Sequence, residues 1–140
     1  MRILPNLTLI LCLDATANAA DLAESCRAKA GAGYQSSARV SPPSIRGDFD
    51  GDGKADMAVL VTRGGKQGVV ICRSGAAKPE VLGAGTPFND MPDLDFTAWR
   101  LHPASRQPKL GRDALYLEWE SASAIVYWNG KRWAWRQQGD

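Results

Sequence analysis

An acidic loop that runs directly into an apolar strand is the feature that most constrains this chain. Residues 47–61 read GDFDGDGKADMAVLV, with aspartates at positions 48, 50, 52 and 56. Carboxylates that are packed together repel one another unless a cation lies between them. Calcium accepts about 6–8 carboxylate, carbonyl and water oxygens in a flexible shell, whereas magnesium demands a stricter octahedron. We therefore predict a calcium site in the loop 47–56.

The expected ligands are four side chains and one carbonyl: Asp48, Asp50, Asp52, Asp56 and the backbone carbonyl of Lys54. Asp56 would close the loop directly or through a water. Gly53 follows the third aspartate at the sixth position, where a sharp bend is needed. An EF-hand is excluded, because its twelfth position requires a glutamate and this chain has Val59 there. The alternative is an Asp/Gly turn that binds no metal.

The stretch 45–62 resembles an FG-GAP or VCBS-type repeat, in which a D-x-D-x-D-G-x-x-D calcium loop leads into a strand of a propeller blade. The resemblance implies the same five ligands, including Asp52 and the Lys54 carbonyl. The loop occurs once, whereas a β-propeller needs about four blades or more. We therefore expect a single hairpin of this type and not a complete propeller.

The amino end has the pattern of a signal peptide over residues 1–19. Arg2 precedes an apolar run at 3–13, and small residues follow up to Ala19. The run is shorter than the roughly 20 residues of a membrane-spanning helix. We expect a periplasmic or secreted protein with no membrane span, whose residues 20–140 form a single β-rich domain.

Two cysteines, Cys26 and Cys72, remain after the expected cleavage. An even pair in an oxidising compartment is the setting in which a disulfide forms. A metal role is disfavoured, because the two cysteines are far apart in sequence and the single histidine has no partner pattern beside it. We therefore predict a Cys26–Cys72 disulfide.

The expected fold is mainly β, of the α+β class, with one helix at the amino end. A capping pattern at 21–24 and an alanine-rich stretch that ends before Gly31 predict a helix of about three turns. The run 57–63 is almost continuously apolar, as in a strand that is covered on both faces. Further strands are expected at 69–73, 80–82, 96–101, 114–119, 123–128 and 131–138. Together these patterns predict an antiparallel sheet of about six strands.

The dipeptide Asn129-Gly130 is the strongest turn signal in the chain, since both residues tolerate the positive φ of a type I′ turn. A two-residue turn predicts three opposed pairs: Trp128 with Lys131, Val126 with Trp133, and Ala124 with Trp135. The tryptophan side of this hairpin should then face the core, because aromatic strand residues are usually buried. The other side, with Tyr127, Arg132 and Arg136, should face solvent or a partner.

The composition argues against two classes of function. The formal net charge is +2 and the cations are scattered, which does not indicate nucleic-acid binding. His102 is the single histidine, and no motif of a nucleophile with its base is present. We expect a non-catalytic monomeric module that binds a protein or an envelope component. The alternatives are a periplasmic inhibitor or immunity protein of a cell-wall hydrolase, and an enzyme of an unrecognised type.

Two surfaces are candidates for the partner. The first is the loop 84–95, whose apolar residues Phe88 and Met91 stand among turn formers. The second is the hairpin side with Tyr127, Arg132 and Arg136. The loop acids Asp90, Asp93 and Asp95 could instead supply a further calcium ligand, or could simply be solvated.

Overall fold

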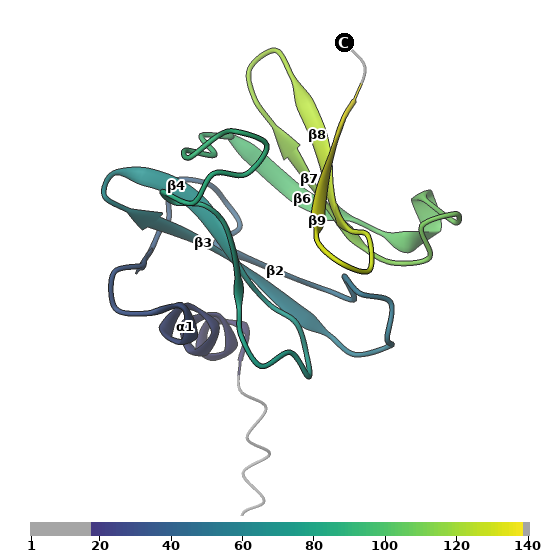
Figure 1. Cartoon of the computed structure of the whole chain (residues 1–140), viewed down its shortest axis with the longest axis horizontal. Helices are drawn as coiled ribbons and strands as arrows, with labels where there is room; N and C mark the ends of the chain where they lie inside the picture. The colour runs from purple at the N-terminus through teal and green to yellow at the C-terminus, as the bar shows by residue number, and fades with distance from the viewer. Residues whose placement is uncertain (1–17, 139–140) are drawn as a thin grey trace, which may run out of the picture.

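Two antiparallel sheets pack face to face, and the helix α1 (Ala19–Ala30) covers the outer face of one of them (Figure 1). The computed structural model describes residues 18–138. The expected signal peptide lies outside the described residues except for its last two positions. Within residues 18–138, no helix is long and apolar enough to cross a membrane.

The first sheet is built around β3, which the sequence predicts to be covered on both faces. Its strands are β1 (Gln35–Ser36), β2 (Ser44–Gly47), β3 (Asp56–Arg63), β4 (Lys66–Cys72) and β5 (Glu80–Gly83). The order is β1-β3-β4-β5, and β2 pairs with the same edge of β3 as β1 does. Residues 56–61 are all buried, which confirms the expectation for this strand.

The second sheet is a meander in which each strand pairs with the next one. Its strands are β6 (Ala98–His102), β7 (Ala114–Glu118), β8 (Ser123–Trp128) and β9 (Trp133–Gln137). A short 3₁₀ turn, η1 (Ala104–Arg106), lies between β6 and β7. The mainly β fold with one amino-terminal helix is therefore confirmed, but the strands form two sheets instead of one.

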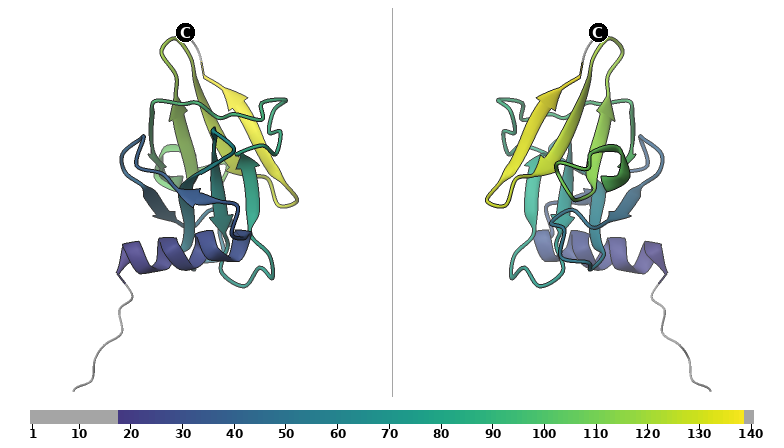
Figure 2. Two further views of the ribbon diagram at one scale, coloured as in Figure 1. Left: turned by 90° about the vertical axis from the view of Figure 1, so that its left-hand side faces the viewer. Right: turned by 90° about the vertical axis from the view of Figure 1, so that its right-hand side faces the viewer.

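The helix α1 (Ala19–Ala30) lies across the first sheet, as the two views of Figure 2 show. Its cap is Asn18, whose side chain accepts a hydrogen bond from the Asp21 backbone N–H at 2.9 Å, and it ends at Gly31 as predicted. Cys26 is buried against β3 and β4, in a small cluster with Met57 and Val70. The predicted disulfide is present: Cys26 is bonded to Cys72, with the two Cα atoms 5.8 Å apart.

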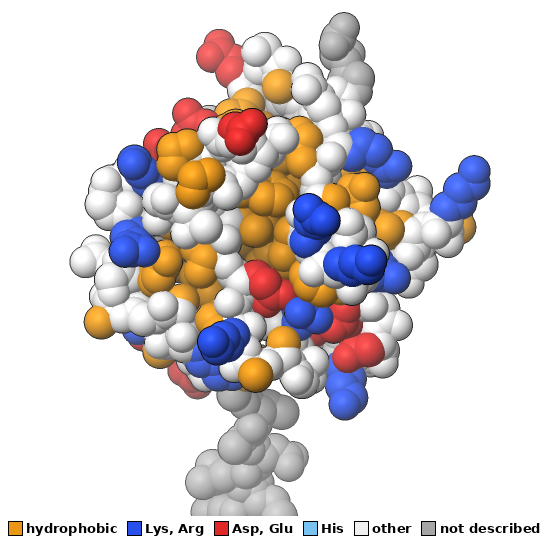
Figure 3. Space-filling model, in the orientation of Figure 1, with side chains coloured by type: hydrophobic (Ala, Val, Ile, Leu, Met, Phe, Trp, Pro, Cys, Tyr) orange, Lys and Arg blue, Asp and Glu red, His pale blue; other side chains and the backbone are white. Residues whose placement is uncertain are grey.

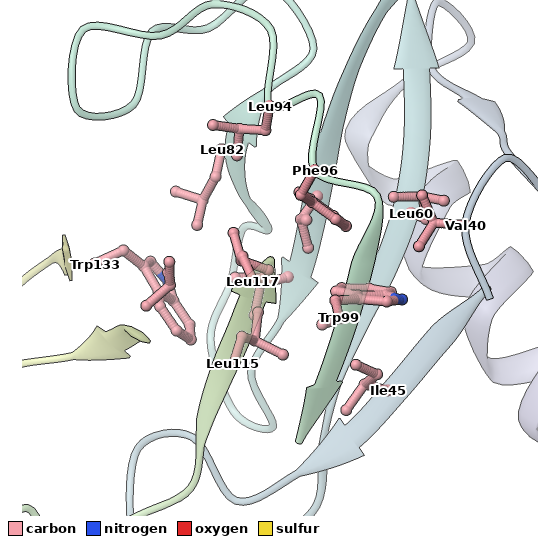
Figure 4. Packing of buried hydrophobic residues seen from close by; sticks show 14 of the residues in the cluster. Val40, Ile45, Leu60, Leu82, Leu94, Phe96, Trp99, Leu115, Leu117 and Trp133 are labelled. Atoms are coloured by element: carbon pink, nitrogen blue, oxygen red, sulfur yellow. The ribbon is translucent and has the colours of Figure 1, made fainter. Parts of the chain in front are cut away.

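The main core fills the space between the two sheets. Figure 4 shows Leu60 of the first sheet on one side of this space, with Trp99 and Leu117 of the second sheet facing it. Phe96 lies between the sheets and is 1% exposed. Because side chains alternate along a strand, one face of β3 packs in this core and the other face packs against α1.

The β8–β9 hairpin has a different register from the one expected. Its observed pairs are Trp128 with Trp133, Val126 with Trp135, and Ala124 with Gln137. The turn is longer by two residues because the Asn129 side chain accepts hydrogen bonds from the backbone N–H groups of Lys131 and Arg132, both at 2.9 Å. A shift of two residues preserves the faces, so both tryptophans still face the core.

Candidate functional site

The acidic loop joins β2 to β3 and brings three of its four carboxylates together. Oxygen atoms of Asp48, Asp50 and Asp56 lie within 4.8 Å of one another. Gly53 has a φ of 82°, in the left-handed region, and its backbone N–H returns to the Asp48 carboxylate at 2.8 Å. The bend expected at this glycine is therefore present.

Asp52 is not part of the group of three. Its side chain is exposed and accepts a hydrogen bond from the Lys54 backbone N–H at 2.8 Å. This hydrogen bond is the main reason why the pKa of Asp52 lies below its ordinary value. Asp52 and the Lys54 carbonyl therefore remain predicted ligands on the basis of the sequence alone.

Backbone amides hold the carboxylates in place. The Asp48 carboxylate accepts from the N–H groups of Gly51, Asp52 and Gly53. Asp56 is 2% exposed and accepts from Phe49 N–H at 2.9 Å and from Ser74 N–H at 2.7 Å. Because a carboxylate offers about four acceptor positions, the free capacity of the group lies mainly on Asp50 and Asp56.

Negative charge is unfavourable at two of the three carboxylates. Burial raises the pKa of Asp50, with smaller contributions from a hydrogen bond to Asp52 and the charge of Asp56. Burial likewise raises the pKa of Asp56, against the hydrogen bonds from Ser74 and Phe49. The Arg73 guanidinium lies 3.6 Å from Asp50 and stacks over the Trp128 ring at 3.8 Å. A cation at this group would relieve the remaining repulsion.

Two residues that sequence reasoning missed attach the loop to the second sheet. Asp113 accepts from the backbone N–H of Asp48 at 2.9 Å and from that of Ala104 at 2.8 Å. Its own backbone N–H donates to the Asp48 carbonyl at 2.9 Å. Phe49 is fully buried and meets Trp133 edge-on, with ring centroids 5.8 Å apart. The spacing of the loop acids is visible in the sequence, but no local pattern relates Asp113 to them.

The apolar residues of loop 84–95 pack against the core. Phe88 and Met91 close a tight turn through reciprocal backbone hydrogen bonds, with Asn89 and Asp90 at positive φ between them. Both side chains are half-buried, and Phe88 meets Trp135 edge-on at 6.0 Å. Figure 3 shows hydrophobic side chains along the middle of this side of the molecule. Both residues therefore pack against the core and remain partly exposed, and their role in binding a partner stays a prediction.

The loop acids serve as hydrogen-bond acceptors within the fold. Asp93 accepts from Gln67 N–H at 2.9 Å, and Asp95 accepts from the Trp119 indole at 2.8 Å. Neither residue nor Asp90 belongs to the metal-compatible group found among residues 18–138. The suggestion of a further ligand from this loop therefore has no structural support.

Three residues are expected on one face of the hairpin. Tyr127 and Arg136 lie together there, whereas Arg132 lies outside the strand. The Arg136 guanidinium is 5.9 Å from the centroid of the Tyr127 ring. Arg132 lies in the turn before β9, because the hairpin turn is longer than predicted. Arg132 therefore lies beside this face and not on it, and the partner-binding role of the three residues stays a prediction.

Comparison with protein-family models, with curated proteins and with solved structures gives no significant match for this chain. The resemblance to FG-GAP and VCBS-type repeats therefore rests on the residues of the loop alone.

Proposed function

We propose that this protein is a non-catalytic, exported calcium-binding module that acts by binding a protein or an envelope component. The observation that carries the calcium part is the convergence of Asp48, Asp50 and Asp56 at a loop bend. Hard carboxylate oxygens are the ligands that calcium prefers. When bound, calcium supplies positive charge that offsets the carboxylates and stabilises the loop.

The donor set fits this ion. Asp56 is fixed by two backbone amides, and Asp50 retains acceptor capacity on the same side of the loop. Burial is the main cause that raises the pKa of Asp50 and of Asp56, so a bound cation would favour their charged forms. Arg73 offsets the charge of Asp50 only partly, because its nearest distance to Asp50 is 3.6 Å, beyond a normal hydrogen bond.

Calorimetric titration with calcium tests the site directly. Extracellular calcium modules have dissociation constants of about 10⁻⁴–10⁻³ M, so millimolar calcium should stabilise the protein by roughly 0.4–1.4 kcal/mol. Asp50→Asn should weaken calcium binding at least about tenfold, and Asp90→Asn, in an acid outside the group, should not. Asp52→Asn measures whether the fourth aspartate contributes. No heat of binding, together with equal melting temperatures in calcium and in chelator, rejects the site.

The binding role is supported by the outer face of the second sheet, which the β6–β7 connection covers only in part. The helix α1 covers the outer face of the first sheet, whereas the outer face of the second sheet presents Tyr127 and Arg136. Capture from an envelope extract, with heat-denatured protein as the control, should retain a specific component. Turnover of a substrate by the purified protein would contradict the non-catalytic role.

A further inference from the structure

The connection between β6 and β7 folds over part of the outer face of the second sheet and borders an open cleft there. This connection is the green segment over the sheet in the right-hand view of Figure 2. The cleft has a volume of about 580 Å³, within the range of roughly 300–1,000 Å³ that is usual for ligand sites. Its lining includes three cations and three apolar or aromatic residues: Arg106, Lys109, Arg136, Pro108, Leu110 and Tyr127.

The cleft is positively charged without internal compensation. Among residues 18–138, no Asp or Glu lines the cleft, and none of its three cations forms an ion pair. Arg100, on the same face of the sheet, is instead paired with Glu118. Three exposed cations at one cleft attract an anion and disfavour a cation.

The single histidine gives a second indication of this positive field. His102 is on β6, next to the connection that forms the cleft, and its Nε2 is buried without a hydrogen-bond partner among the described residues. Its pKa is lowered by burial first and then by the charges of Arg106, Arg100 and Arg136. An anion that binds near these arginines would oppose the electrostatic part of this shift.

The apolar part of the lining defines what the anion must carry. Tyr127 is half-buried, and Pro108 and Leu110 add apolar surface beside its ring. A small inorganic anion would contact the cations but would leave this apolar surface exposed to water. A ligand that carries a carboxylate beside an apolar group would contact both the cations and the apolar surface. Its carboxylate could bind an arginine in a bidentate manner.

We infer that this cleft binds an acidic segment of a partner protein, with a Glu or Asp carboxylate at Arg106, Lys109 and Arg136 and an adjacent apolar side chain against Tyr127. The inference rests on the proposed binding function and names the chemistry of its partner. The cleft has room for more than one side chain, which favours a peptide segment over a single free carboxylate.

The probe is the blocked peptide acetyl-Glu-Leu-Glu-Phe-Glu-amide, titrated by calorimetry and by NMR of His102. The peptide should bind, its affinity should fall with added salt, and the pKa of His102 should rise at saturation. The triple variant Arg106→Gln, Lys109→Gln, Arg136→Gln should bind at least about tenfold more weakly. All three side chains are exposed, so this variant should remain folded.

A variant with the same change in net charge separates the cleft from the overall charge. Arg39→Gln, Lys66→Gln and Lys78→Gln remove three exposed cations that do not line the cleft, and this variant should keep the affinity of the unmodified protein within about twofold. The peptide with Gln in place of every Glu should not bind. Phosphate and phenylacetate should bind more weakly than the peptide.

Several outcomes would overturn the inference. Equal losses in the two triple variants would show binding to net charge only, and equal affinity of the Gln peptide would show that carboxylates are not recognised. Binding of phenylacetate as strong as that of the peptide would assign the cleft to a free small carboxylate. Absence of peptide binding, with a partner still captured by the cleft variant, rejects the cleft and leaves the proposed function intact. If the unmodified protein neither binds calcium nor captures a partner, the proposed function itself is rejected.

Discussion

At the scale of single residues, one carboxylate outside the acidic loop holds that loop against the second sheet. Asp113 accepts hydrogen bonds from Asp48 and Ala104, which lie on two separate connections. It is half-buried, so solvent replaces these bonds poorly if they are lost. Asp113 therefore links the acidic loop to the β6–β7 connection.

Asp113→Asn should lower the free energy of unfolding by about 1–3 kcal/mol, because hydrogen bonds to a charged acceptor are strong and an amide offers a single acceptor oxygen. Urea unfolding measures the change. Asp90→Asn is the matched control, since Asp90 is exposed, and its effect should stay within about 0.5 kcal/mol. Equal effects of the two substitutions would show that Asp113 does not brace the loop.

The single histidine should make stability depend on pH. The folded-state pKa of His102 lies below the ordinary value of 6.5, because of burial and of the nearby charges of Arg106, Arg100 and Arg136. The unfolded chain therefore takes up the proton first as the pH falls. This contribution to stability is full above pH 6.5 and is lost as the pH falls from there to the folded-state pKa.

His102→Gln should remove this pH dependence. Above pH 6.5 the difference in unfolding free energy between the two proteins should be constant, and below it the unsubstituted protein should lose stability relative to the variant. Denaturant unfolding at a series of pH values measures the difference. Parallel pH profiles for the two proteins would contradict the lowered pKa.

At the scale of elements, the attachment of α1 to the first sheet depends on one covalent bond and a small apolar cluster. The cluster contains Cys26, Met57, Val59, Val61, Val70 and Ala84. A helix of 12 residues is marginal in isolation, so its stability comes from this contact. The Cys26–Cys72 bond adds a covalent link between the helix and β4 to this contact.

Replacing Cys26 and Cys72 together by alanine should strongly destabilise the protein. The bond closes a segment with a sequence separation of 46, which corresponds to about 4 kcal/mol as an upper value in the chain-entropy model. The urea midpoint of the double variant should match that of the reduced protein. An unchanged midpoint would show that the bond does not constrain the unfolded chain.

At the scale of the whole molecule, the two sheets share one core and should unfold together. Phe49 of the acidic loop is fully buried and contacts Trp133 of β9. Leu60 of the first sheet and Leu117 of the second sheet belong to the same cluster. Neither sheet can bury its inner face without the other.

Phe49→Ala should lower the unfolding free energy by about 3–5 kcal/mol, as is usual for a buried phenylalanine. The tryptophans all lie at or beyond position 99, so their fluorescence reports the second sheet, whereas far-UV circular dichroism also includes α1 and the first sheet. The two transitions should coincide in the unsubstituted protein and shift together in the variant. Separate transitions would show that the sheets are independent folding units.

The sequence by itself determined those features that depend on neighbouring residues. The apolar run of β3, the bend at Gly53 and the end of α1 before Gly31 each follow from local backbone and side-chain preferences. The disulfide followed from an even pair of cysteines in a chain that the sequence predicts to be exported. The convergence of Asp48, Asp50 and Asp56 also follows locally, since all three belong to one short loop.

Tertiary structure decided what depends on which surfaces meet. Phe88 and Met91 read as free loop residues in the sequence, but they pack against the core because the second sheet lies beside them. The turn before β9 is closed by the Asn129 side chain, which removes Arg132 from the sheet face. Asp113 reaches the loop across 65 positions of sequence. Contacts of this kind depend on how distant segments pack in three dimensions, and a local pattern carries no information about that packing.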